Sequence, residues 1–188
     1  MRVLVFLVLI CCIGAAYRPG KPGAPSRRDT TELPQLFGFG RPATPREIAI
    51  LDIAIAPDGK GLPPGSGTAA SGKAVYAVKC AACHGKTGVE GPYTQLVGPM
   101  GDTTKSKTIG NYWPYATTLF DYTRRAMPYN APGSLTNNEV YALTAFLLTA
   151  NRVIDSSMII TSHNLAGIEM PAKKFFIPDD RKGGPEVR

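Results

Sequence analysis

The sequence predicts an all-α fold with three main helices around one core and long irregular segments on both sides. Apolar residues recur at helical spacing in three separate stretches, and no strand pattern of consequence occurs. The length of 188 residues suits one domain with extensions. We expect this domain at 69–152, between an N-terminal extension at 17–68 and a C-terminal extension at 153–188.

The composition is that of a globular protein, with 44% hydrophobic and 19% charged residues. A formal net charge of +7 favours acidic partner surfaces. No stretch of Lys and Arg is dense enough to form a nucleic-acid patch, so we expect no nucleic-acid binding.

Residues 1–16 have the pattern of a signal peptide, which predicts export. Arg2 precedes an apolar run from Val3 to Ile13, and small residues follow at 14–16. The apolar stretch is shorter than the ~20 residues of a membrane-spanning helix. An uncleaved membrane anchor is the alternative.

The extension at 17–68 is rich in Gly and Pro, which predicts irregular coil. Both extensions nevertheless carry too many apolar residues for free linkers, so they either wrap the domain or dock on a partner. These residues are Ile48, Ile50, Leu51, Ile53 and Ile55 in the first, and Ile159, Ile160, Phe175 and Phe176 in the second.

The first predicted helix covers 72–79, where Gly72, Val75, Tyr76 and Lys79 fall on one stripe. Because glycine has no side chain beyond hydrogen, Gly72 would let this helix approach another closely, with Tyr76 against Leu143 and Phe146.

The second predicted helix covers 114–126 and begins at a proline suited to a first turn. The third follows a capping box formed by Thr136 and Glu139, and its apolar residues continue at helical spacing to Ala150.

The run Cys-Ala-Ala-Cys-His at 80–84 is the attachment motif for c-type haem. The thiols of Cys80 and Cys83 are spaced to bond the two vinyl groups of one porphyrin, and His84 is then the proximal iron ligand. A zinc site would need two further ligands, and a thioredoxin-like dithiol would need a βαβ setting that this sequence lacks. We therefore expect one covalently bound haem c.

Together, the haem motif, Gly72, Tyr76 and the last helix with Leu143 and Phe146 resemble a class I c-type cytochrome. This resemblance covers Gly72 to about Arg152. It implies the class I cytochrome c fold and a Met ligand on the loop before the last helix, where Met127 precedes Pro128. The alternatives are Met170, His163, Met100, Met158 and an open iron site.

The resemblance also implies three residues near the haem. Pro99 would supply the carbonyl that accepts a hydrogen bond from His84, with Pro92 as the alternative. Tyr112 and Trp113 stand where the family commonly places an aromatic donor to a haem propionate, although both could be ordinary core aromatics.

Three further stretches, at 37–44, 57–67 and 109–128, resemble the cytochrome subunit of bacterial sulfur dehydrogenase. That family works beside a molybdenum protein of the sulfite-oxidase family. Well-known members carry two haem motifs and this sequence has one, so it also resembles the shorter single-haem cytochromes that accompany sulfite-oxidase-like dehydrogenases.

These resemblances imply an electron-transfer protein of the periplasm, and no catalytic residues are expected. Its donor would be a molybdenum sulfite or sulfur dehydrogenase, and its acceptor another cytochrome or a terminal oxidase. A general soluble shuttle is the alternative. A haem enzyme or gas sensor with an open iron site is a third reading, and rapid carbon monoxide binding would favour it.

Overall fold

The computed structural model describes residues 38–99 and 106–179. The expected signal peptide at 1–16 and Met100 lie outside the described residues. Contacts divide the chain into two units, Met1–Ala43 and Thr44–Arg188. Residues 38–43 of the first unit contain no helix or strand, and every element below belongs to the second unit.

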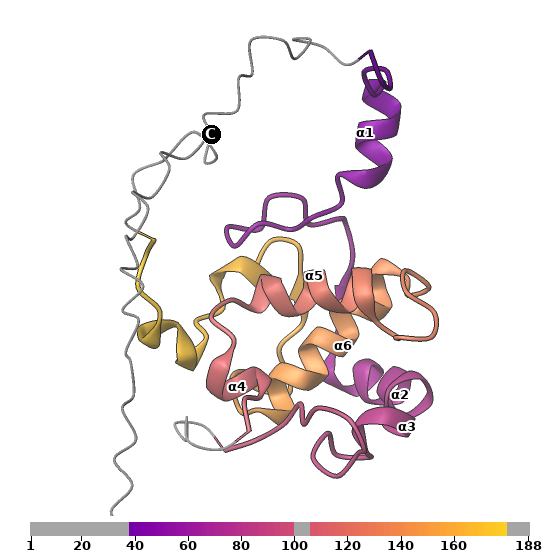
Figure 1. The fold of residues 1–188 in the computed structure, drawn as a ribbon. Helices are drawn as coiled ribbons and strands as arrows, with labels where there is room; N and C mark the ends of the chain where they lie inside the picture. The colour runs from indigo at the N-terminus through magenta and orange to yellow at the C-terminus, as the bar shows by residue number, and fades with distance from the viewer. Residues whose placement is uncertain (1–37, 100–105, 180–188) are drawn as a thin grey trace, which may run out of the picture. The chain divides into compact units, whose positions relative to one another are not determined.

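Helix α6 (Asn137–Ala150) packs against both α2 (Ala69–Lys79) and α5 (Ala116–Ala126), as Figure 1 shows. Thr136 caps α6 together with Glu139, as the sequence predicts. Helix α5 begins at Ala116, two residues later than its expected start at Pro114, because Tyr115 is still extended. This arrangement confirms the expected all-α fold.

The crossing of α2 and α6 depends on Gly72. A methyl group at this position would overlap the carbonyl of Ala142 on the facing helix. Four residues later, the rings of Tyr76 and Phe146 pack with their centres 5.0 Å apart. The close approach predicted from Gly72 is therefore confirmed.

Two further helices are too short for a hydrophobic period to reveal them. Helix α3 (Ala81–His84) follows α2 directly, and α4 (Ile109–Tyr112) precedes α5. The side chain of Asn151 fixes α4, because its Oδ1 accepts hydrogen bonds from the backbone N–H groups of Gly98 at 3.3 Å and Gly110 at 3.2 Å.

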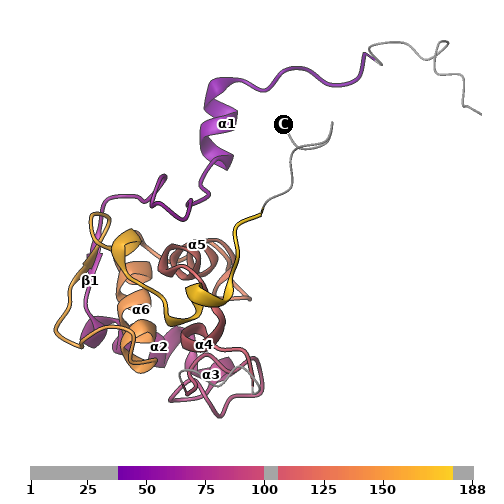
Figure 2. The same cartoon turned by 90° about the vertical axis from the view of Figure 1, so that its left-hand side faces the viewer.

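The described part of the C-terminal extension wraps the domain. Strand β2 (Ile160–Thr161) pairs antiparallel with β1 (Ser66–Gly67), and two short 3₁₀ helices follow, η1 (Leu165–Gly167) and η2 (Pro171–Phe175). Figure 2 shows this segment passing alongside α6. Ile160 and Leu165 are fully buried, so this extension completes the core.

The N-terminal extension is less irregular than its Gly and Pro content predicts. Helix α1 (Pro45–Leu51) starts at a capping box of Thr44 and Glu47 and buries none of its residues. Further along, Ile55 is buried, and its backbone N–H donates to Oδ1 of Asp121 at 3.0 Å. None of the helices in the described ranges has the length and apolar character needed to cross a membrane.

Candidate functional site

The two cysteines lie where α2 passes into α3. Cys80 ends α2, and the single turn of α3 brings Cys83 and His84 round to the same end of that helix. Both thiols are free, with Cys80 half-buried and Cys83 exposed. Burial raises the pKa of the Cys80 thiol to about 11. Two thiols three residues apart on a helical turn share one face and can reach one ligand.

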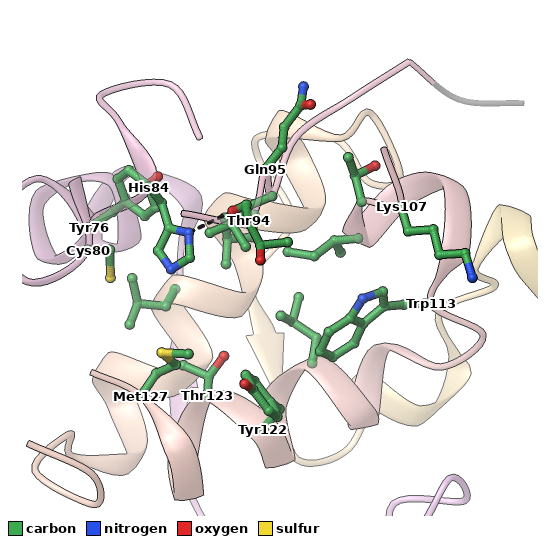
Figure 3. Close-up of a pocket in the computed structure, with 16 residues that line it drawn as sticks. Tyr76, Cys80, His84, Thr94, Gln95, Lys107, Trp113, Tyr122, Thr123 and Met127 are labelled. Carbon is green, nitrogen blue, oxygen red and sulfur yellow. Dashed lines mark hydrogen bonds between the residues drawn. The ribbon is translucent and has the colours of Figure 1, made fainter. Parts of the chain in front are cut away.

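A cavity beside these residues is lined by Cys80, His84 and Met127, and Figure 3 shows His84 and Met127 on opposite sides of it. The walls come from α2, α4, α5 and α6 and from the loop after α3. The large apolar side chains among them are Leu96, Ile109, Trp113, Leu119, Leu143 and Leu147. An imidazole and a thioether thus face each other across an apolar slot.

A second cavity continues from the first to the surface. Cys80, His84 and Thr94 line both cavities, and Cys83, Pro128 and Tyr129 line only the outer one. The slot therefore opens to solvent beside Cys83.

The orientation of His84 is set by a hydrogen bond between its Nδ1 and the carbonyl oxygen of Thr94, at 2.8 Å. A carbonyl can only accept, so Nδ1 carries the proton and Nε2 keeps a free lone pair for a metal. Burial raises the pKa of the nearby Tyr76 to about 12, and its hydroxyl donates to the carbonyl of Gly85 at 2.9 Å.

The expectation that Pro99 supplies this carbonyl is wrong in this structure, and so is the alternative Pro92. The loop after α3 turns back early, because Gly91 lies against the backbone of residues 83–85 with no room for a side chain. The N–H of Tyr93 then donates to the carbonyl of Cys83 at 3.2 Å, which places Thr94 beside His84. Pro99 instead lines a separate cavity with Asn151 and Arg152.

Met127 ends α5 and contributes to the cavity wall, joined to Pro128 by a cis peptide bond. Met170 is 3% exposed and belongs to the hydrophobic core without lining the cavity. Met158 and His163 lie exposed on the surface. Among the candidate sixth ligands in the described residues, Met127 is the one that shares the cavity with His84.

The structure separates the two candidate aromatic donors. Trp113 lines the cavity, with its ring 5.8 Å from that of Tyr122. Tyr112 does not line it and packs against Phe176, with ring centres 5.7 Å apart.

The sequence interpretation missed several polar residues of the cavity. Gln95, Lys107, Thr108 and Tyr122 also line it. Thr108 is 2% exposed, and its hydroxyl proton has no acceptor among the described residues. Its position before α4 could have been read from the pairing of Thr108 with Asn111, whose Oδ1 accepts from the Thr108 N–H at 2.7 Å.

Residues of the types that a haem needs are all present: two thiols at one edge, an imidazole with a free lone pair, a thioether opposite and apolar walls. The unpartnered hydroxyl of Thr108 adds a donor to the cavity wall. In contrast, no group of three or more His, Cys, Asp or Glu that could hold a metal ion occurs within 38–99 and 106–179. The slot therefore fits a haem.

Comparison with known proteins supports this interpretation. A family model described as Cytochrome c matches residues 69–151. Among solved structures, a chain in the crystal structure of the sulfane dehydrogenase SoxCD from Paracoccus pantotrophus is similar, with 42% sequence identity and a TM-score of 0.69. The match covers 78% of this chain and 74% of that chain. A comparison with curated proteins gives no match.

Proposed function

Because this chain belongs to the cytochrome c family, whose members carry electrons on covalently bound haem, we propose that it holds one haem c and accepts electrons from a sulfur-compound dehydrogenase. The observation that carries the haem assignment is the facing pair of His84 and Met127 beside Cys80 and Cys83. A single attachment motif, at 80–84, supports one haem per chain.

Cys80 and Cys83 would hold the haem through two thioether bonds. Each S–H would add across one vinyl double bond, so that sulfur bonds one carbon and hydrogen the other, and no oxidant would be consumed. Because Cys80 is half-buried and Cys83 is exposed, one bond would lie inside the slot and one at its mouth.

His84 and Met127 would be the two protein ligands of the haem iron. Thr94 keeps the His84 ring in the tautomer that offers Nε2, and makes that nitrogen a better donor. The thioether sulfur of Met127 is a soft ligand that favours ferrous iron and raises the reduction potential. With both residues bound to the iron, the haem would supply one-electron transfer, and no position would remain for a substrate.

The mouth of the slot is the natural route for the electron. Val78 and Tyr129, which line the outer cavity, are 82% and 85% exposed. Lys79 is a charged lining residue of that cavity, and its ammonium pairs with Glu139 at 2.6 Å. This apolar, locally neutral rim suits contact with a partner that brings its own cofactor close.

The 42% sequence identity to a chain in the sulfane dehydrogenase structure supports a sulfur-compound dehydrogenase as the electron donor. We assign the donor to the molybdenum enzymes of the sulfite-oxidase type, and the acceptor to another cytochrome or a terminal oxidase. The expected signal at 1–16 supports a periplasmic location.

A reduction assay tests the donor. Sulfite or a sulfane compound, mixed with the cognate molybdenum protein and the oxidised cytochrome, should produce the ferrous spectrum rapidly. Neither sulfur compound alone should do so. Reduction at the same rate without the molybdenum protein would refute the assignment.

Location is tested on native protein. We expect a mature chain that begins near Tyr17 and is released with periplasmic contents. A chain that still begins at Met1 and sediments with membranes would identify an uncleaved anchor.

A further inference from the structure

The cavity has two chemically different ends (Figure 3). Cys80, His84 and Met127 mark one end, and Lys107 and Trp113 lie at the other. A haem carries its two vinyl groups on one side of the macrocycle and its two propionates on the opposite side. If the vinyl groups bond Cys80 and Cys83, the propionates extend toward the end that holds Lys107.

Thr108 follows Lys107 in the chain and lines the same cavity with an unused donor. The residue is 2% exposed, and no group in the described part of the chain accepts its hydroxyl proton. A buried polar group without a partner is destabilising, so native proteins rarely leave one without a role. A hydroxyl that faces a ligand carboxylate would be satisfied.

The backbone holds Thr108 firmly in place. Its N–H donates to Asn111 at 2.7 Å, and Asn151 accepts from Gly110 in the same short helix at 3.2 Å. Lys107, the preceding residue, also lines the cavity and brings a cation. Its ammonium lies 4.3 Å from the centre of the Tyr112 ring, at the exposed edge of this end.

We propose that the hydroxyl of Thr108 donates a hydrogen bond to a haem propionate and that Lys107 supplies the opposite charge. This inference rests on the proposed haem function. A buried carboxylate needs hydrogen bonds and a counter-charge, and a charge-assisted bond is about twice as strong as a neutral one. Thr108 and Lys107 are thus positioning residues that also set the reduction potential.

The potential is the diagnostic quantity. Donors to a propionate withdraw negative charge that would otherwise stabilise ferric iron, so their removal should lower the reduction potential. We expect Thr108→Val, which keeps the shape and deletes the hydroxyl, to shift the reduction equilibrium up to about tenfold toward the ferric form, or ~59 mV for one electron.

Matched variants separate this effect from a loss of packing. Thr149 carries the other buried hydroxyl without a partner in the described residues but does not line the cavity. Thr149→Val should leave the potential unchanged, and Thr108→Ser should restore it. An unchanged potential in Thr108→Val, or equal shifts in both valine variants, would overturn the proposal.

The reduction potentials of two lysine variants, both at exposed positions, test the role of Lys107 independently. Lys107→Gln should lower the potential more than Lys73→Gln, because Lys73 lines neither cavity. Equal shifts in the reduction potential would show that Lys107 acts only as a surface charge and would refute its proposed role. If Thr108→Val fails to take up haem, Thr108→Ser and Lys107→Gln still decide the question.

The haem content of each protein, measured by intact mass, distinguishes a failure of the proposed haem function from a failure of the roles proposed for Thr108 and Lys107. Wild-type protein without haem would refute the proposed function and this inference together. Haem-loaded variants with the wild-type potential would refute the inference alone.

Discussion

The imidazole Nδ1 of His84 and the carbonyl oxygen of Thr94 lie 2.8 Å apart, across a loop that Gly91 folds back onto α3. This contact joins His84 to the loop that follows α3. The loop therefore both orients the imidazole ring and forms part of the cavity wall beside it.

Haem attachment should be covalent and doubly anchored. Acid-acetone extraction should leave the colour on the wild-type chain, because thioether bonds survive denaturation. Cys83→Ala should retain one thioether, and the double variant with Cys80→Ala should lose the colour on extraction. Colour that leaves the wild-type polypeptide would show that the attachment is wrong.

Replacing Met127 with Ala should abolish the far-red sulfur-to-iron absorption band and lower the potential, because the cavity then lacks its thioether. Met170→Leu serves as the control. It keeps the volume of a core residue that is 3% exposed, should cost under about 1.5 kcal/mol of stability, and should retain the band. Loss of the band in Met170→Leu alone would identify the other sulfur as the ligand.

Gly72→Ala should destabilise the protein strongly, since the added methyl group meets the backbone of Ala142. Overpacking of this kind typically costs about 1–3 kcal/mol in the free energy of unfolding, measurable by denaturant titration. Gly167→Ala is a suitable control, because a side chain there has no atom within 4 Å. Equal stabilities of the two variants would contradict the described crossing.

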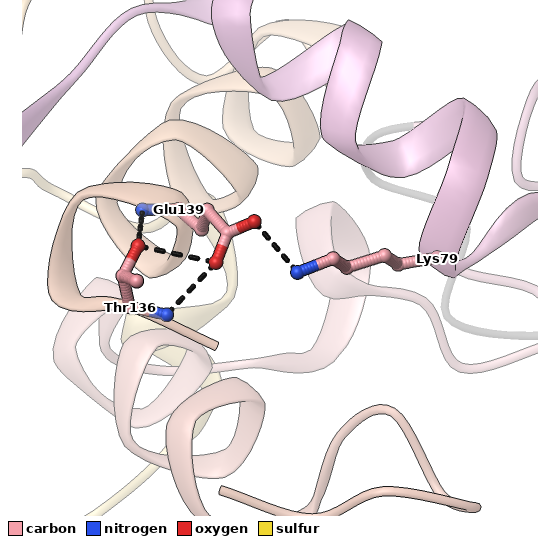
Figure 4. A network of polar contacts seen from close by, with 3 residues as sticks. All are labelled: Lys79, Thr136 and Glu139. Carbon is pink, nitrogen blue, oxygen red and sulfur yellow. Dashed lines mark hydrogen bonds and ion pairs between the residues drawn. The ribbon is translucent and has the colours of Figure 1, made fainter. Parts of the chain in front are cut away.

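The stability of the α6 N-terminus should depend on pH through Glu139 (Figure 4). Hydrogen bonds from Lys79 and then from Thr136 lower the pKa of Glu139 below its ordinary value of 4.5. A lowered folded-state pKa stabilises the fold above the unfolded-state pKa, and this stabilisation disappears as the pH falls through the folded-state value.

We therefore expect Lys79→Met to cost about 0.2–1 kcal/mol in unfolding free energy at neutral pH, and less as Glu139 becomes protonated. Denaturant titrations at several pH values measure the difference from wild type. Lys73→Met controls for the loss of a surface charge on the same helix. A difference that stays constant down to pH ~3 would exclude the ion pair as its source.

Electron delivery at the slot mouth should respond little to salt, because the Lys79 ammonium at its rim is already paired. At ~0.15 M ionic strength the Debye length is ~8 Å, so a charge-steered encounter would slow clearly.

Tyr129→Lys should slow reduction by the donor without changing the haem spectrum. Val89→Lys, at an exposed site outside the outer cavity, should not.

The sequence predicts the helices that are long enough to show a period, and it misses those that are not. The capping box at Thr136 locates α6 correctly. The stripe through Gly72 and Tyr76 locates α2 but misses its first three residues, because α2 begins at Ala69 after the cap at Thr68. Helices α3 and α4 have four residues each, so their ends depend on tertiary contacts such as the Asn151 amide.

Dependence on tertiary contacts also explains which residues of the site the sequence could and could not suggest. The Cys-Ala-Ala-Cys-His run is contiguous in sequence and Met127 ends a predicted helix, so the sequence alone could suggest that they belong to one site. The acceptor for His84 is a backbone carbonyl, which any residue type can provide. Its identity depends on how the loop turns at Gly91, and a proline that resembles a family feature was a poor guide to it.

The pairing of β1 with β2 has a consequence for the order of biosynthesis. Ser66 and Gly67 precede the attachment motif, whereas their partners Thr161 and Ile160 follow α6, so the sheet cannot close until nearly the whole chain has emerged. Contacts this distant in sequence form slowly. During that interval Cys80 and Cys83 belong to a domain whose last segment has not yet closed the core.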